Sequence, residues 1–124
     1  MNKIHIFVLV CVFIAGAANV SADVPAAQAE EVKHLLAFVK DSGCILSRNG
    51  TDYSAEKAVS HIEKKHEYFR DEIKSTEDFI EYSATKSLMS DDYYTVTCPG
   101  RETIKTRDWL LTELKKYRSS RKLH

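Results

Sequence analysis

Several features that would indicate a familiar activity are missing from this sequence. It has no Cys-x-x-Cys pair, which excludes a thioredoxin-like redox motif, and no glycine-rich motif of the kind that holds phosphates. It contains no internal repeat and no low-complexity segment. Beyond the N-terminal segment there is no apolar run approaching the roughly 20 residues that a membrane span needs. These absences favour a small globular protein without an evident catalytic motif.

The N-terminal segment has the pattern of a secretory signal peptide. Lys3 gives a short positive region, an apolar run extends from Ile4 to about Ala18, and Val20-Ser21-Ala22 provides the small residues that signal peptidase needs. We therefore predict a signal peptide over residues 1–22, cleaved after Ala22. Residues 23–124 are then expected to form a single globular domain, ordered over about residues 28–118, with no stable membrane insertion.

Charge is balanced in total but unevenly distributed. Residues 23–100 carry 9 basic and 15 acidic side chains, whereas residues 101–124 carry 8 basic and 3 acidic ones. A basic C-terminal segment can bind nucleic acid or anionic lipid, and it can equally be the solvated face of a terminal helix. For an exported protein we favour the solvated helix, and no nucleic-acid partner is predicted.

Cysteine is scarce, and its count is informative. Cys11 falls in the predicted signal, which leaves Cys44 and Cys98. An even number of cysteines in an oxidising compartment predicts a disulfide. Closing a loop of about 55 residues would contribute roughly 4 kcal/mol in the chain-entropy model. The alternatives are two buried free thiols or a thiol nucleophile.

The spacing of apolar residues predicts an α+β fold dominated by about four helices, with a short two-stranded antiparallel element. Two short strand-like runs lie at 44–48 and 93–98, and Asn49-Gly50 is a strong turn signal after the first run. If Cys44 pairs opposite Cys98, Arg48 falls opposite Tyr94. One helix is predicted from about Gln28 to a stop at Gly43, and a second from about Ala55 to Asp71, with Ser54 as its N-cap. A third is predicted after a cap at Ser75 or Thr76, and a fourth after a cap at Thr106.

Polar residues cluster around the Asn-Gly turn and form the candidate binding surface. Its members are Arg48, Asn49, Tyr53, His61 and Lys65. An arginine fork binds carboxylates and phosphates well, so this surface could receive an anionic ligand. The alternative is purely structural, since Asn-Gly is already explained by a turn and solvated cations are common on helices.

The sequence gives less support to a catalytic or metal-binding site than to this binding surface. Lys86-Ser87 contains the residue types of a Ser-Lys nucleophile pair, but neighbours at a helix end rarely face each other. His61 and His66 lie about 140° apart around a helix, so one ion cannot easily bind both. Asp91-Asp92 lacks the spaced ligands of a calcium loop. We therefore predict no catalytic residues, no metal and no cofactor.

Longer segments carry a family resemblance. The stretches SGC…SRNGTDYSAEKAVSHIEKK, STEDFIEYSATKS and YYTVTCPG resemble the YfeK-like family of small exported bacterial proteins of unknown function, from about Glu31 to Leu114. The resemblance implies a periplasmic protein and supplies no activity or cofactor. One departure is Asp91-Asp92-Tyr93, where the family often has a Gly-Lys-Pro-like turn.

The leading functional hypothesis is a small periplasmic, non-enzymatic binding or interaction module. Its partner would be a periplasmic protein or a small anionic ligand at the candidate binding surface. Two alternatives stay open: a hydrolase acting on envelope components or small esters and amides, with Ser87 or His61 involved, and a chaperone-like factor of the envelope stress response.

Overall fold

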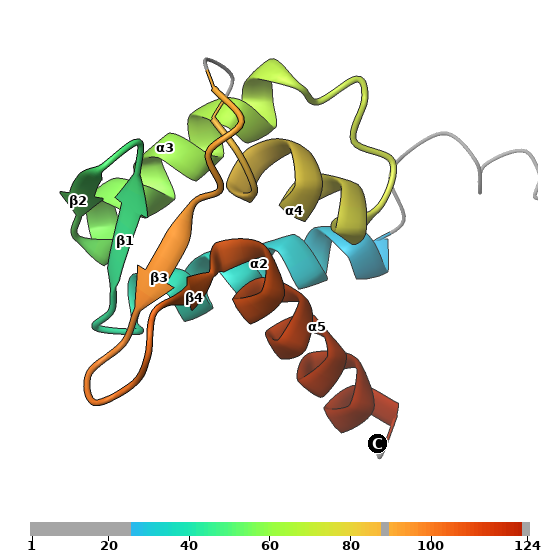
Figure 1. The fold of residues 1–124 in the computed structure, drawn as a ribbon. Coiled ribbons are helices and arrows are strands. Elements are labelled where there is room, and N and C mark those ends of the chain that lie inside the picture. Colours follow the sequence, from blue (N-terminus) through green and yellow to red (C-terminus); the bar gives the residue numbers. More distant parts are fainter. Residues whose placement is uncertain (1–25, 88–89, 123–124) are drawn as a thin grey trace, which may run out of the picture.

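The computed structural model describes residues 26–87 and 90–122, and the predicted signal peptide lies outside this part. The described residues form a helix-dominated α+β structure, as the sequence predicts (Figure 1). Its elements are α2 (Ala26–Lys40), β1 (Ile45–Arg48), β2 (Thr51–Tyr53), α3 (Ala55–Tyr68), α4 (Thr76–Ala84), β3 (Thr95–Thr97), β4 (Ile104–Lys105) and α5 (Thr106–Lys122).

The sheet has four strands where the sequence predicts two. All pairs are antiparallel, in the order β2-β1-β3-β4. Strands β2 and β4 are missing from the prediction because three and two residues are too few to show an alternating pattern. Asn49 and Gly50 join β1 to β2 with φ angles of 52° and 78°, the positive values that a two-residue hairpin turn requires.

The predicted disulfide and its register are both present. Cys44 and Cys98 are bonded, with Cα atoms 4.2 Å apart. Next to the bond, Ile45 pairs with Thr97 and Leu46 with Val96, which is the register expected from placing the two cysteines opposite each other. The covalent bond and the central strand pair therefore hold the same two segments together.

Serine caps begin two of the helices. Ser54 accepts a hydrogen bond from the Lys57 amide, and Ser75 accepts one from the Asp78 amide, so Ser75 and not Thr76 caps α4. Helix α3 ends at Tyr68, three residues before the predicted end. The chain turns there, and the turn returns Ile73 to the core at 8% exposure.

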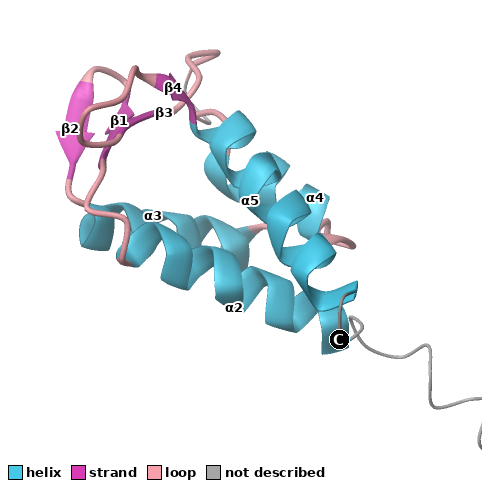
Figure 2. Cartoon of the chain, turned by 90° about the horizontal axis from the view of Figure 1, so that it is seen from below, coloured by secondary structure: helices cyan, strands magenta, loops and turns pink. Residues whose placement is uncertain are grey.

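The helices form one hydrophobic core, and the sheet stands at one end of them (Figures 1 and 2). Helix α4 contacts α2, α3 and α5, while α2 and α3 lie side by side. Helix α3 contacts the β1–β2 half of the sheet, and α5 contacts the β3–β4 half. The largest buried side chains are Phe79, Leu35, Ile80, Leu110, Val39 and Val96. None of the described helices combines the length and the apolar character needed to cross a membrane.

Candidate binding site

A small cavity lies where the sheet meets α3, α4 and α5. Its volume is about 30 Å³. The buried wall is mostly apolar and includes Leu46 from β1 and Ile62 from α3. The partly exposed wall is formed by Ser47 and by the three side chains Arg48, Tyr53 and His61, which we call the rim.

Three buried polar atoms around this cavity have no hydrogen-bond partner. They are His61 Nε2, Ser83 Oγ and Thr106 Oγ1. Ser83 and Thr106 are 0% and 1% exposed, so bulk water does not reach them freely. Buried polar groups in native proteins are nearly always hydrogen-bonded. Among the described residues, the only other atom of this kind is Gln28 Oε1, near the start of α2.

The rim is held together by aromatic contacts. The Arg48 guanidinium carbon lies 5.3 Å from the centre of the Tyr53 ring, within the range of a cation–π contact. The Tyr53 ring in turn meets His61 edge-to-face, at 4.8 Å between centres. No carboxylate of residues 26–87 and 90–122 forms an ion pair with Arg48. Its guanidinium is therefore positioned over the cavity while its charge is unpaired.

The surroundings of His61 favour the neutral form of its imidazole. Burial lowers the pKa of its imidazole, and the positive charges of Arg48, Lys64 and Lys57 lower it further. A neutral imidazole offers one N–H donor and one nitrogen acceptor. Ser83 and Thr106, which also line the cavity, carry uncharged hydroxyl groups that can donate and accept hydrogen bonds.

Two of the five predicted site residues have other roles. The Asn49 amide donates to Ser87 Oγ and accepts from Ser90 Oγ, both at 3.1 Å, and so ties the hairpin turn to the segment between α4 and β3. The Lys65 ammonium donates to the Lys86 carbonyl at 2.6 Å and to the Tyr94 hydroxyl at 3.0 Å. The structure thus brings Arg48, Tyr53 and His61 together and places Asn49 and Lys65 in supporting contacts beside them.

The sequence analysis missed Ser83 and assigned Thr106 a different role. Ser83 lies between Ile80 and Ala84 on the buried face of α4, where a small polar residue gives little signal. Thr106 was predicted to cap the last helix. It is instead the first residue of α5 and one of the residues that line the cavity, and its buried hydroxyl has no hydrogen-bond partner.

The other candidates for chemistry have contacts of their own. Ser87 accepts a hydrogen bond from Asn49, whereas the Lys86 ammonium lies 5.3 Å from the Tyr93 ring. His66 packs edge-to-face on Phe79, a residue of the core. In the part of the chain that the structure describes, no three His, Cys, Asp or Glu side chains gather as metal ligands would.

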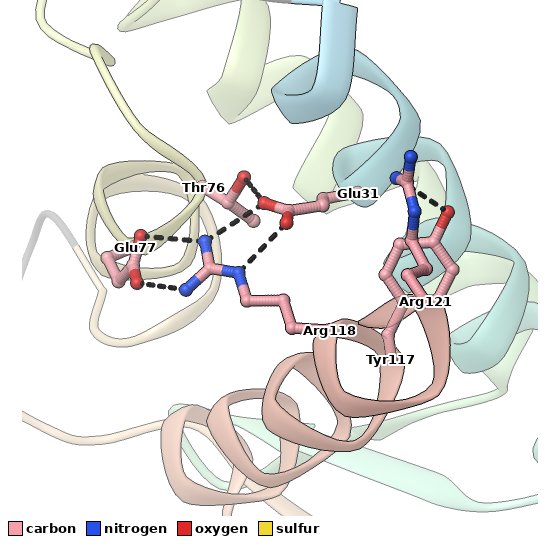
Figure 3. A network of polar contacts seen from close by, with 6 residues as sticks. All are labelled: Glu31, Thr76, Glu77, Tyr117, Arg118 and Arg121. Atoms are coloured by element: carbon pink, nitrogen blue, oxygen red, sulfur yellow. Dashed lines mark hydrogen bonds and ion pairs between the residues drawn. The ribbon is translucent and has the colours of Figure 1, made fainter. Parts of the chain in front are cut away.

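A second polar cluster, with Glu31 and Thr76 buried, lies at the opposite end of the helices and is hydrogen-bonded throughout (Figure 3). Arg118 of α5 lies between Glu31 of α2 and Glu77 of α4, donating to Glu31 at 2.8 and 2.9 Å and to Glu77 at 2.7 and 3.3 Å. Thr76 donates to Glu31 at 2.6 Å. Arg118 lowers the pKa of both carboxyl groups. We call these four residues the helix clamp, because they join three helices.

Fold and site together define a small disulfide-linked α+β protein with a small, mostly apolar cavity beside an arginine-bearing hairpin. Residues 26–118 match a protein family described as a family of unknown function, DUF5329, and the chain belongs to that family. No curated protein and no solved structure matches the chain. The finer resemblance to YfeK-like exported proteins stays a prediction.

Proposed function

We propose that this protein is a non-enzymatic binding module of the periplasm that takes a small carboxylic acid at the rim and the cavity beneath it. The observation that carries the proposal is the combination of an unpaired, positioned arginine with three unpartnered buried polar atoms in one cavity. Neither feature adds to the stability of the fold, and both are what a ligand site needs.

The ligand's carboxylate would bind to Arg48. A guanidinium donates two parallel hydrogen bonds to a carboxylate, and these charge-assisted bonds are about twice as strong as neutral ones. Tyr53 supports the guanidinium from one side at 5.3 Å and limits the side-chain freedom that binding would otherwise have to remove. Arg48 therefore gives the preference for an anion.

The cavity adds a preference for a short polar group next to the carboxylate. A volume of about 30 Å³ accommodates only one or two non-hydrogen atoms. Ser83, Thr106 and neutral His61 can donate to and accept from such a group, but they offer no charge to balance a second anion. A hydroxyl group suits these partners, so small 2-hydroxy acids are the proposed ligand class.

Two features support a location in the periplasm. Residues 1–22 have the signal-peptide pattern, and the Cys44–Cys98 disulfide is stable in an oxidising compartment. Small acids enter the periplasm from outside the cell, so a binding module there would meet its ligand directly.

The test is a titration of ¹⁵N-labelled mature protein with lactate, glycolate and acetate, followed by NMR. We expect the amide signals of the rim and of Ser83 to shift, with the two hydroxy acids binding more tightly than acetate. Arg48→Gln should weaken binding about tenfold or more, because the charge-assisted pair is lost. Arg70→Gln is the matched control, since Arg70 lies on the surface and, within residues 26–87 and 90–122, forms an ion pair only with Glu67.

Two results would contradict the proposal. One is that none of the three acids moves the rim signals at millimolar concentrations. The other is that Arg48→Gln and Arg70→Gln weaken binding equally, which would indicate a nonspecific effect of net charge. Amide spectra of both variants establish that the fold is retained.

A further inference from the structure

Three cationic side chains gather around one tyrosine ring, away from the cavity lining. The ring belongs to Tyr93, which precedes β3. Lys105 Nζ lies 4.2 Å from its centre, Lys86 Nζ 5.3 Å, and the Arg107 guanidinium carbon 5.4 Å. We infer that these four residues, the Tyr93 cluster, form a binding site for a phosphate group, independent of the proposed function of the rim.

The backbone brings these residues together from three segments. Lys86 follows α4 and forms an isolated antiparallel bridge with Tyr93. Lys105 lies in β4, opposite Thr95 of β3. Arg107 is the second residue of α5. The cluster is thus built on regular backbone pairing around the end of the sheet, and the three charges are held near one another by the fold.

The stability of the fold does not explain this arrangement. Like charges held close together repel, and cations at the start of a helix oppose its macrodipole, as Lys105 and Arg107 do beside α5. Lys86 and Lys105 form no ion pair with any described residue. Arg107 is paired with its neighbour Asp108 at 3.3 Å, and Glu81 adds a weaker attraction. The cluster therefore keeps an excess of positive charge that a bound anion would balance.

The chemistry of the cluster favours a phosphate over a carboxylate. Two lysines act as point charges and one arginine as a planar fork, so together they can bind several oxygens at once. A phosphate presents three or four oxygens and up to two negative charges, whereas a carboxylate presents two oxygens and one charge. Each of the three cations lies within cation–π range of the same ring, and this contact restrains their side chains.

The experiment compares a cluster variant with a variant matched in charge. Lys86→Gln with Lys105→Gln removes two cluster cations, and Lys33→Gln with Lys40→Gln removes two exposed cations from α2. Each ¹⁵N-labelled protein is titrated with inorganic phosphate at constant ionic strength, and the Tyr93 and Lys105 amide signals are followed. Binding to vesicles of phosphatidylglycerol, with phosphatidylcholine vesicles as reference, is measured in parallel.

The expected result is that the cluster variant binds phosphate about tenfold more weakly than the native protein, while the α2 variant changes less than about twofold. Binding to phosphatidylglycerol that is lost only in the cluster variant would identify a lipid headgroup as the source of the phosphate. The inference is overturned if both variants lose binding equally, or if neither phosphate nor the anionic vesicles bind. Arg48→Gln leaves this binding unchanged, so failure here is distinguishable from failure of the proposed function.

Discussion

The helix clamp and the cavity each contain buried polar side chains, but these differ in whether they are hydrogen-bonded. In the clamp, Glu31 is 7% exposed and its carboxylate accepts three hydrogen bonds, from Thr76 and Arg118. In the cavity, the hydroxyl groups of Ser83 and Thr106 are at least as buried and accept none. The comparison indicates which polar residues the fold uses for its own stability and which it leaves available for a partner.

Removing a polar group should change the free energy of unfolding in opposite directions in the clamp and in the cavity. Removing one partner of a buried, bonded carboxylate is destabilising, because it leaves a buried charge without compensation. An unbonded hydroxyl already costs about 1–3 kcal/mol, so removing it relieves that cost. Substitutions at the two ends of the helices should therefore shift the free energy of unfolding in opposite directions.

The largest expected effect comes from breaking the clamp. Glu31→Gln keeps the shape of the side chain but removes the charge that balances Arg118. We expect the free energy of unfolding to fall by about 2 kcal/mol, less than for a fully buried pair because the Arg118 side chain is 40% exposed and keeps Glu77. Urea unfolding measures the change.

Glu30→Gln is the control for this substitution, because Glu30 is the residue next to Glu31 and its carboxylate is exposed. It should change stability by less than about 0.5 kcal/mol. Equal losses in the two variants would mean that the clamp contributes nothing beyond general charge.

A pair of threonine substitutions sharpens the comparison. Thr76 and Thr106 are 0% and 1% exposed, but only Thr76 has a bonded hydroxyl. Thr76→Val should lower the free energy of unfolding by about 1.5 kcal/mol, whereas Thr106→Val should raise it by about 1 kcal/mol. Thermal unfolding of the two variants would show melting temperatures displaced to opposite sides of the native value. A loss of stability in Thr106→Val similar to that in Thr76→Val would contradict the contrast drawn here.

Much of this architecture could be predicted from the sequence, because it depends on strong local signals. Asn49-Gly50 determined the hairpin turn, and two cysteines flanking apolar runs determined the register of β1 against β3. Ser54 caps its helix as predicted. Strands β2 and β4 were not predicted, because they are short and pair through their neighbours without an alternating pattern of their own.

The polar clusters were harder to predict, since they depend on contacts between residues distant in sequence. Glu31 and Arg118 are separated by 87 positions, and nothing in either local sequence points to the other. The rim was partly predictable because Arg48 and Tyr53 belong to one hairpin. The cavity beneath it was not, because Ser83 and Thr106 meet only when α4 and α5 pack together.

The smallest expected effect is the change in the free energy of unfolding with pH. Histidine and carboxyl groups should contribute to it in different pH ranges. Burial lowers the pKa of His61 and of His66 below the usual 6.5. The unfolded chain therefore binds protons more readily than the folded one, and the neutral histidines favour folding most above about pH 6.5. This contribution is lost as the pH falls from there toward the lower pKa values of the folded protein.

The clamp loses its contribution in a more acidic range. Arg118 lowers the pKa of Glu31 and Glu77 below the usual 4.5, so their contribution is fully present above that value and is lost as the pH falls through the folded pKa values. The free energy of unfolding, measured from about pH 7.5 to about pH 3, should thus decline in two phases. His61→Gln should reduce the first phase and leave the second, whereas Glu31→Gln should do the reverse. If both variants altered the same phase, the two ends would not titrate independently, and assigning stability to one and ligand binding to the other would lose its physical basis.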